Sequence, residues 1–303
     1  MLKIILSRLA QGLLVLIFLY TATFFLVRLM PGDMFTSDKA LSAQALKEKK
    51  AEFDLDKPMP TQFAISLKKL IFEGDLRESD VKDQPVSKII AHSFPTSFLL
   101  GTAGMVIAIF VGMPAGIIAA LRKNSMIDYG TMLVALVGIS IPAFVLGPLL
   151  AKTLGENVPF LKVAGWGGPF DWVLPSITLG LATAAYLARI TRAGMLDILS
   201  QDYIRTAKAK GVSEQAIIIK HALKGGLIPS VAYIGPAFAM LITGSFIVET
   251  IFQCPGMGQH FINATKERDI FLLQGIVLFF GSLIVVVNLL ADITLIALNP
   301  RLR

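Results

Sequence analysis

The chain has 303 residues, of which 54% are hydrophobic and only 16% are charged, and its formal net charge is +7. Soluble domains carry about 25% charged residues, so this composition excludes an ordinary soluble enzyme and a disordered protein. The single cysteine, Cys254, excludes an intramolecular disulfide framework, and its place beside Pro255 and Gly256 is typical of a small apolar residue at a helix end. The composition therefore favours one membrane-embedded unit over two soluble domains.

Six stretches of the chain carry no charge and are candidates to cross a bilayer. A bilayer core about 30 Å thick requires a helix of about 20 mostly apolar residues, because lipid offers the backbone no hydrogen-bond partners. Five stretches reach this length, namely residues 9–27, 93–121, 129–151, 225–248 and 270–291. The remaining stretch, residues 172–188, is the fourth in chain order, and it becomes long enough if its helix also carries Arg189 and Arg192, whose long side chains can reach the interface. We therefore expect an all-α, polytopic membrane protein with six transmembrane helices.

The first stretch follows Lys3 and Arg8, as the apolar part of a secretory signal peptide would. Its 19 uncharged residues exceed the roughly 7–15 of a signal peptide, and no small-x-small cleavage site follows them. We expect residues 1–30 to form an uncleaved signal-anchor helix.

The basic residues indicate how the chain is oriented. With the N-terminus inside, the inner segments hold 13 lysines and arginines, and the two short outer loops hold four. Membrane proteins show this excess on the cytoplasmic side, and the remaining basic residues surround a long outer segment that counts little in the rule. The net charge therefore indicates topology, with both termini in the cytoplasm, and not a nucleic-acid-binding surface.

Residues 31–93 make up the long outer segment. Residues 42–50 have helix-forming composition, residues 62–72 have helical apolar spacing, Gly74 breaks the second helix, and residues 85–86 begin another. The segment is too ordered for a linker and too short for a stable independent domain. We expect a small cap over the outer mouth of the membrane domain. The alternative is a solvated loop packed on that domain without a partner.

Residues 195–228 form an inner loop after the fourth stretch. Residues 202–211 predict a basic helix that ends at a glycine, and Ser213 is placed to cap a second helix with Glu214 in its first turn. This second helix, residues 214–223, carries a row of apolar residues at Ala216, Ile217, Ile218 and Ile219. A free cytoplasmic surface does not usually expose such a row, so we expect the loop to sit in a groove of a partner protein. The alternative is an amphipathic helix on the membrane surface.

The same loop carries a family motif. The run from Arg205 to Gly211, followed by His221, Leu223 and Pro229, resembles the coupling-loop motif of ATP-binding-cassette (ABC) importer permeases. It is most similar to the variant found in oligopeptide and dipeptide permeases. In the general motif, glutamate and two alanines are followed by three residues and glycine, and then by nine residues and isoleucine-x-leucine-proline.

Four positions depart from that general motif. Arg205 replaces the glutamate, Thr206 the first alanine, His221 the isoleucine and Lys224 the proline, departures typical of the peptide-transporter branch, in which the proline falls later. At Arg77 the family usually has glycine, so we expect the cap to differ locally there. Other segments similar to the family are Met30-Pro31-Gly32-Asp33, Leu55-Asp56-Lys57-Pro58, Gly74-Asp75-Leu76, Ile141-Pro142-Ala143-Phe144, Ala188-Arg189-Ile190-Thr191-Arg192, Glu249-Thr250-Ile251-Phe252, Pro255-Gly256-Met257-Gly258-Gln259 and Asn299-Pro300-Arg301.

The resemblance implies a type I ABC importer transmembrane domain, with residues 94–303 as a five-helix permease core beside the anchor helix and the cap. In such importers the permease does no chemistry and holds no cofactor or metal of its own, and two partner ATPase subunits bind ATP and Mg. Their motion would enter the membrane through a coupling loop, here residues 202–224. The coupling residues implied are Arg205, Thr206, Ala207, Gly211, Val212, Ser213, Glu214, His221 and Leu223.

The resemblance also implies partners, cargo and location. The chain would pair with a homologous second permease and receive a soluble or lipid-anchored peptide-binding protein on its outer face, within the lipids of a bacterial cytoplasmic (inner) membrane. The chain looks most like the B-type subunit of oligopeptide permeases, so oligopeptides are the expected cargo. Dipeptides, nickel, glutathione and other small solutes are alternatives.

Polar residues within the apolar stretches allow two interpretations. Glu249 near the outer end of the fifth span, and Asn288 and Asp292 in the sixth, are candidates to line a peptide path, because charges within membrane spans tend to be functional. The alternative is structural pairing of Glu249 and Asp292 with Arg189, Arg192 or a partner subunit.

The chain lacks the sequence motifs of an ATPase and of a zinc protease. It has no Gly-x-x-x-x-Gly-Lys-Ser/Thr phosphate loop and no His-Glu-x-x-His zinc motif, and His92, His221 and His260 lie far apart in the sequence. A secondary transporter or channel that works without an ATPase is the remaining alternative. Co-purification with two ATPase subunits would support the importer, and transport by this chain alone in liposomes would exclude it.

Overall fold

The computed structural model describes residues 2–29 and 43–298, and these are predominantly helical. Four helical runs are long and apolar enough to cross a membrane: Ile5–Leu29, Val86–Leu121, Val173–Leu199 and Ile270–Ile296. Two further pairs of helices are bent at short breaks, and the spans number six if each bent pair is one span. The all-α, six-span architecture is confirmed in this form. The family-like segments at residues 30–33 and 299–301 lie outside the described residues.

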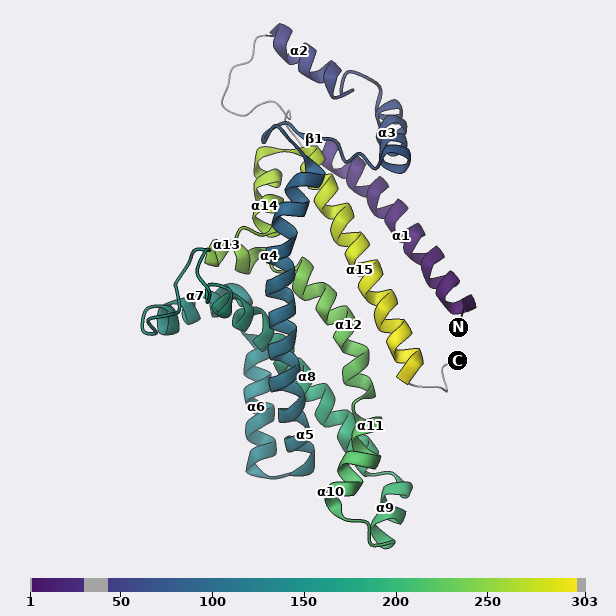
Figure 1. Cartoon of the computed structure of the whole chain (residues 1–303), viewed down its shortest axis with the longest axis vertical. Helices are drawn as coiled ribbons and strands as arrows, with labels where there is room; N and C mark the ends of the chain where they lie inside the picture. The colour runs from purple at the N-terminus through teal and green to yellow at the C-terminus, as the bar shows by residue number, and fades with distance from the viewer. Residues whose placement is uncertain (1, 30–42, 299–303) are drawn as a thin grey trace.

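The first and last spans lie side by side. α1 (Leu2–Leu29) runs along α15 (Ile270–Leu298), purple beside yellow in Figure 1. Two glycines bring the helices close, since a Cβ atom at Gly12 would meet α15 and one at Gly281 would meet α1. The helix predicted as a signal anchor is therefore packed into the membrane domain.

The second span is continuous with the cap. α4 (Val86–Ile107) passes through a π-helical turn, η2 (Ala108–Gly112), into α5 (Met113–Leu121). α4 crosses the predicted boundary between residues 93 and 94 without a break. The cap and the second span therefore share one helix.

A proline bends the third span. α6 (Met126–Ser140) and α7 (Ala143–Leu150), the latter extended by the π-helical turn η3 (Ala151–Gly155), meet at 103°. Ile141 is extended (φ −83°, ψ 115°), because the ring of Pro142 disfavours helical backbone at the residue before it. The predicted uncharged stretch is thus two helices and not one straight span.

α8 (Val173–Leu199) is the central helix of the molecule. It packs against α4, α5, α6, α7 and α12 (Ile228–Thr243). Its 27 residues include Arg189 and Arg192. The prediction that these arginines extend the weakest apolar stretch to full length is confirmed.

The fifth span belongs to the second bent pair. The helical segment that ends with α11 (Leu223–Gly226) meets α12 at 47°. α13 (Phe246–Phe252) and α14 (Met257–Glu267) follow on the side of the cap and lead into α15.

The cap forms its predicted helices, and a short pair of strands that the sequence does not predict lies between them and α4. Gly74 ends its second helix in a left-handed conformation (φ +64°), and Pro85 immediately precedes α4. Its elements are α2 (Ala43–Glu52), α3 (Met59–Lys68), the π-helical turn η1 (Lys69–Glu73) and the antiparallel strands β1 (Glu78–Ser79) and β2 (Gln84–Pro85).

The cap and the loop that contains Gly211 lie far apart. Figure 1 shows α2 and α3 at one end of the long axis and α9 (Asp202–Ala209) and α10 (Glu214–Ala216) at the other. The spans separate a cap end from a loop end.

Candidate functional site

The loop end consists of two short helical segments joined by a sharp corner. α9 ends at Ala209, and α10, η4 (Ile217–Ala222) and α11 follow from Glu214. Gly211 adopts a left-handed conformation (φ +76°), and its N–H donates to the carbonyl of Lys208 at 3.0 Å. A side chain at this backbone angle would be strained. The predicted glycine corner is confirmed.

Ser213 occupies the predicted capping position. Its backbone is extended (φ −60°, ψ 147°) and Glu214 begins the helix, but the serine hydroxyl makes no capping hydrogen bond. The position is therefore as predicted, while the expected side-chain bond is not formed.

One face of the loop packs against the membrane helices. Ile204 of α9 and Ile217 and Ala222 of η4 are buried with Met195 of α8 and Ala120 of α5. Because protein interiors are close-packed, a displacement of the loop would also displace the end of α8 that adjoins it.

The opposite face is exposed and carries one large apolar residue. Ile219 is 65% exposed, whereas Ile217 is 2% exposed. Consecutive helical residues point in different directions, so the predicted row of isoleucines is divided between the interior and the surface. The exposed residues of this segment that accompany Ile219 are Ser213, Glu214, Gln215, Lys220, His221 and Lys224.

The other implied coupling residues fall on both faces. Arg205 and Thr206 are exposed on α9, and Arg205 pairs with Asp202 at 3.2 Å. The half-buried members, which pack beside the Ile204 cluster, are Ala207, Val212 and Leu223.

Arg192 of α8 forms a forked ion pair with Asp128 in the first turn of α6. The two bonds measure 2.5 Å (Nε to Oδ1) and 2.7 Å (Nη2 to Oδ2), and Asp128 is fully buried. The N–H of Asn124 donates to the same carboxylate at 2.9 Å. Asp128 is absent from the predicted site, although Ser125 three residues earlier is the signature of a capped helix start. That signature identifies the start of α6, but it does not reveal that Arg192, 64 positions later, pairs with Asp128.

Asp292 pairs with Arg8 and with neither Arg189 nor Arg192. Its Oδ2 lies 3.0 Å from Nε of Arg8, which joins α15 to α1. Asn288 lies one turn earlier on α15 and is half-buried. The pair ties the ends of the first and last spans together.

Glu249 is fully buried in α13 and is held by hydrogen bonds. Its carboxylate accepts the Ser245 hydroxyl at 2.5 Å and the N–H of Gly258 at 2.7 Å. Neither Arg189 nor Arg192 pairs with it, because both arginines lie toward the loop end of α8 while α13 lies toward the cap. Glu249 therefore fixes the turn between α13 and α14, and the alternative of pairing with Arg189 or Arg192 is not realised.

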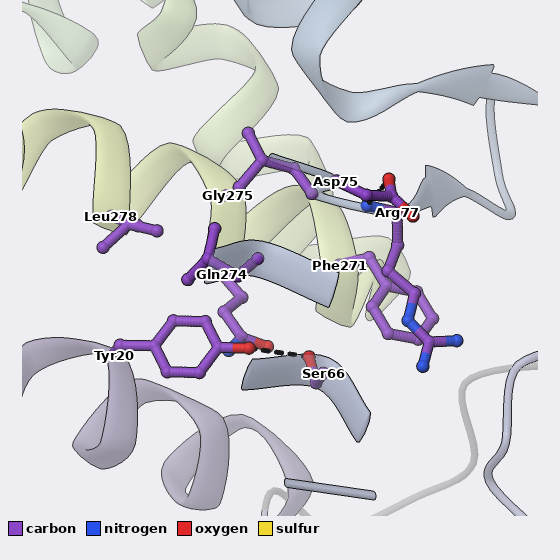
Figure 2. A pocket seen from close by; sticks show the side chains of 10 residues that line it. Tyr20, Ser66, Asp75, Arg77, Phe271, Gln274, Gly275 and Leu278 are labelled. Atoms are coloured by element: carbon purple, nitrogen blue, oxygen red, sulfur yellow. Dashed lines mark hydrogen bonds between the residues drawn. The ribbon is translucent and has the colours of Figure 1, made fainter. Parts of the chain in front are cut away.

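The cap is joined to the spans around a small cavity. Figure 2 shows the hydroxyls of Tyr20 and Ser66, which hydrogen bond at 2.7 Å, together with Arg77 and the ring of Phe271. The cavity measures about 10 Å³, which is the space of a single water molecule. This joint is too small to bind a transported solute.

A larger cavity of about 500 Å³ opens between α5, α6 and α8. Its walls are aliphatic side chains and glycines except for the hydroxyl of Thr131, and they include Val111, Ala115, Val134 and Ala185. Such a lining has almost nothing to pair with the polar groups of a peptide. Arg189, by contrast, is exposed on α8 and forms no ion pair or side-chain hydrogen bond within residues 2–29 and 43–298.

Two family models together match most of the chain. Residues 112–303 match the binding-protein-dependent transport system inner membrane component, and residues 1–101 match the N-terminal model of the binding-protein-dependent transport system membrane component.

Curated relatives match over their full length or nearly so. The oligopeptide transport system permease protein OppB of Salmonella typhimurium is 40% identical over 306 residues, covering 100% of both chains. The dipeptide transport system permease protein DppB of Bacillus subtilis is 38% identical over 284 residues, covering 93% of this chain and 92% of its own. The glutathione transport system permease protein GsiC of Pectobacterium atrosepticum is 37% identical over 305 residues, covering 100% of this chain and 99% of its own.

A solved structure supports the fold independently. A chain of the MetNI methionine ABC transporter, in an inward-facing conformation, matches with a TM-score of 0.61 at 15% identity, covering 71% of this chain and 99% of that chain. The expected fold, the transmembrane domain of an ABC importer, is confirmed. Together with the family matches, the apolar spans place this chain among multi-pass inner membrane proteins, and it belongs to the family of binding-protein-dependent transport system inner membrane components.

Proposed function

We propose that this chain is a permease subunit of an ATP-driven importer and forms part of the translocation path for oligopeptides. The observation that carries the proposal is the 40% identity to an oligopeptide permease over the whole of both chains. The loop end supports it, because a glycine corner and an exposed helical segment form the element through which a separate motor could act. ATP hydrolysis belongs to partner subunits in this proposal, since the chain has no phosphate loop.

The loop would work as a coupling element seated in a groove of an ATPase subunit. Ile219 would supply apolar contact and Glu214, Lys220 and Lys224 would supply a charged rim, as in other helix-in-groove interfaces. The buried contact of Ile217 with α8 would pass the motion to the spans, which would then rock as a rigid body.

The proposal includes three kinds of partner. A second, homologous permease would complete the path, two ATPase subunits would bind at the loop end, and a peptide-binding protein would dock at the cap end. The coupling residues and the division into anchor, cap and core are part of the same proposal. Dipeptides or glutathione are the alternative cargo, because relatives with those names match this chain almost as closely.

Replacement of Gly211 by valine tests the coupling role. The φ of +76° strains any β-branched residue, so the corner must distort and the exposed segment must shift. In the assembled complex in vesicles, we expect ATP-dependent peptide uptake to fall at least about tenfold while membrane insertion is unchanged. Unchanged uptake would contradict the proposal.

Gly74→Val is the matched control. Gly74 has a similar φ of +64°, and, like Gly211, it has no atom near its missing Cβ, but it lies in the cap. We expect this variant to retain peptide-stimulated ATP hydrolysis.

Peptide transport by the wild-type chain alone, without ATPase subunits, would instead favour a secondary transporter.

A further inference from the structure

The exposed residues of α8 form a single stripe on the central helix. They are Tyr186, Arg189, Ala193 and Asp197, and the rest of the helix is buried or half-buried against neighbouring helices. Their spacing of three and four residues places them on one face. A central helix therefore has one open side, and three of the four residues on it are polar or charged.

This stripe does not have the character of a lipid-facing surface. Residues that face lipid on a membrane helix are apolar, as the exposed side of α1 is at Leu9, Leu13 and Phe18. Ionisable residues within membrane spans face the bundle interior or a water-filled cavity. A stripe of this composition fits an aqueous passage better than a lipid-facing surface.

Neighbouring contacts show where this face lies. Ala185 lies against Gly138 of α6, and the ring of Tyr186 lies 4.5 Å from that of Tyr233 of α12. Arg189 is one turn further along from both, so it lies between α6 and α12. Arg189 is thus an exposed residue on a face that α6 and α12 flank.

The charge of Arg189 is not neutralised within the described residues. Arg8 pairs with Asp292 and Arg192 pairs with Asp128, yet Arg189 has no such partner. Asp197 on the same stripe is eight residues away, about 12 Å along the helix axis. A guanidinium presents planar donors that match the two oxygens of a carboxylate. Arg189 therefore has the chemistry of a carboxylate-binding group.

We propose that Arg189 binds the C-terminal carboxylate of the peptide during its passage and so determines which cargo is carried. The inference rests on the proposed function. The open stripe of α8 forms the wall, the Tyr186–Tyr233 pair lies about one turn nearer the cap, and the guanidinium holds the carboxylate near the loop end. The second permease would close the passage on the opposite side.

The test compares trialanine with trialanine amide, which lacks the carboxylate but keeps the rest of the peptide. The complete complex in vesicles is supplied with binding protein loaded to equal occupancy with each peptide, and initial uptake is measured. A charge-assisted hydrogen bond accounts for about tenfold or more in binding. We expect Arg189→Gln to lower the ratio of trialanine to amide uptake at least tenfold, and Arg189→Lys to lower it less.

Arg122→Gln is the matched control. Arg122 is an exposed arginine in the turn between α5 and α6, and it lies off the stripe. We expect this variant to leave the ratio unchanged. Equal loss of both peptides in Arg189→Gln, or no loss, would overturn the inference, because a contact with the second permease or a purely structural role would not distinguish the two peptides.

Lipid binding is a further outcome that the same experiment separates. If the defect of Arg189→Gln disappears in vesicles without anionic lipid, the arginine contacts a lipid headgroup and the inference fails. Failure of the wild-type complex to import trialanine with ATP would instead refute the proposed oligopeptide function. The two failures are therefore distinguishable.

Discussion

Arg77 shows how a single residue can keep a glycine-like backbone and still add a contact. Its φ of +67° lies in the left-handed region, at the position where the family resemblance leads us to expect glycine. The side chain is 8% exposed, pairs with Asp54 at 2.7 Å and lies over the ring of Phe271. A hydrogen bond from Lys57, together with Arg77, lowers the pKa of Asp54 below its usual value. The local difference in the cap is thus an added link between the turn after α2 and α15.

Two substitutions at Arg77 separate its backbone from its side chain. Arg77→Gly and Arg77→Ala both remove the pair with Asp54, but alanine still has to occupy the left-handed conformation, which costs about 1–2 kcal/mol. We expect both variants to melt below the wild type and Arg77→Ala to melt below Arg77→Gly. Thermal unfolding of the purified protein in detergent checks this order. Equal melting temperatures for the two variants would show that the backbone angle has no cost.

At the scale of elements, the pair of Arg192 and Asp128 connects α8 to α6 at the loop end. α8 continues toward the loop that we propose meets the motor, and α6 leads to the bend at Pro142. Because Asp128 is buried and also accepts the backbone N–H of Asn124, its carboxylate cannot lose its partner without leaving a buried charge. The pair therefore holds two spans in register.

A double-mutant cycle measures this connection. Asp128→Asn and Arg192→Gln should each destabilise the protein by about 3–5 kcal/mol, and the double variant should cost less than their sum by about 0.5–3 kcal/mol. Unfolding of the purified protein by denaturant gives the energies. Arg189→Gln combined with Asp128→Asn is the control, and additive effects are expected because Arg189 does not contact Asp128. Additivity in the Arg192 cycle would contradict the pairing.

Local signals in the sequence predict the elements better than their contacts. Gly211 and Gly74 mark helix ends through backbone angles that depend on few neighbours, and both are as expected. Pro142 is visible in the sequence, but whether it bends or ends a span depends on what packs around it. Likewise, Asp128 and Arg192 are 64 positions apart, and only the packing of α6 on α8 brings them together. Ile217 and Ile219 are equally apolar, so the packing of the loop alone decides which is buried.

At the scale of the whole molecule, the cap and the loop lie at opposite ends of the spans. The excess of lysine and arginine around the loop end predicts that this end is cytoplasmic. The single native cysteine suits a test of this orientation. Cys254 is fully buried, and its pKa is raised to about 12 by burial and by the nearby charges of Glu249 and Asp171. Its thiol therefore stays protonated and inert near neutral pH.

Maleimide labelling of single added cysteines tests the orientation. Glu48 in α2 and Lys208 in α9 are both exposed. With an impermeant maleimide added to spheroplasts, we expect Glu48→Cys to react from outside and Lys208→Cys to react only after permeabilisation. The wild type should react in neither case and only after denaturation. Labelling of Lys208→Cys in sealed spheroplasts would contradict this orientation and would place the loop end outside the cell.

The pairing of α1 with α15 has a consequence for biogenesis. α1 is matched, through its glycine contacts and the pair of Arg8 with Asp292, to a helix that is synthesised much later. Between Leu29 and Ile270 the ribosome must add 240 residues. At about 5–20 residues per second, α1 waits in the bilayer for roughly 12–48 seconds before synthesis of α15 begins. During that interval the lipid itself must solvate the glycine-lined face of α1, and the contact between the two helices forms only after α15 has been made.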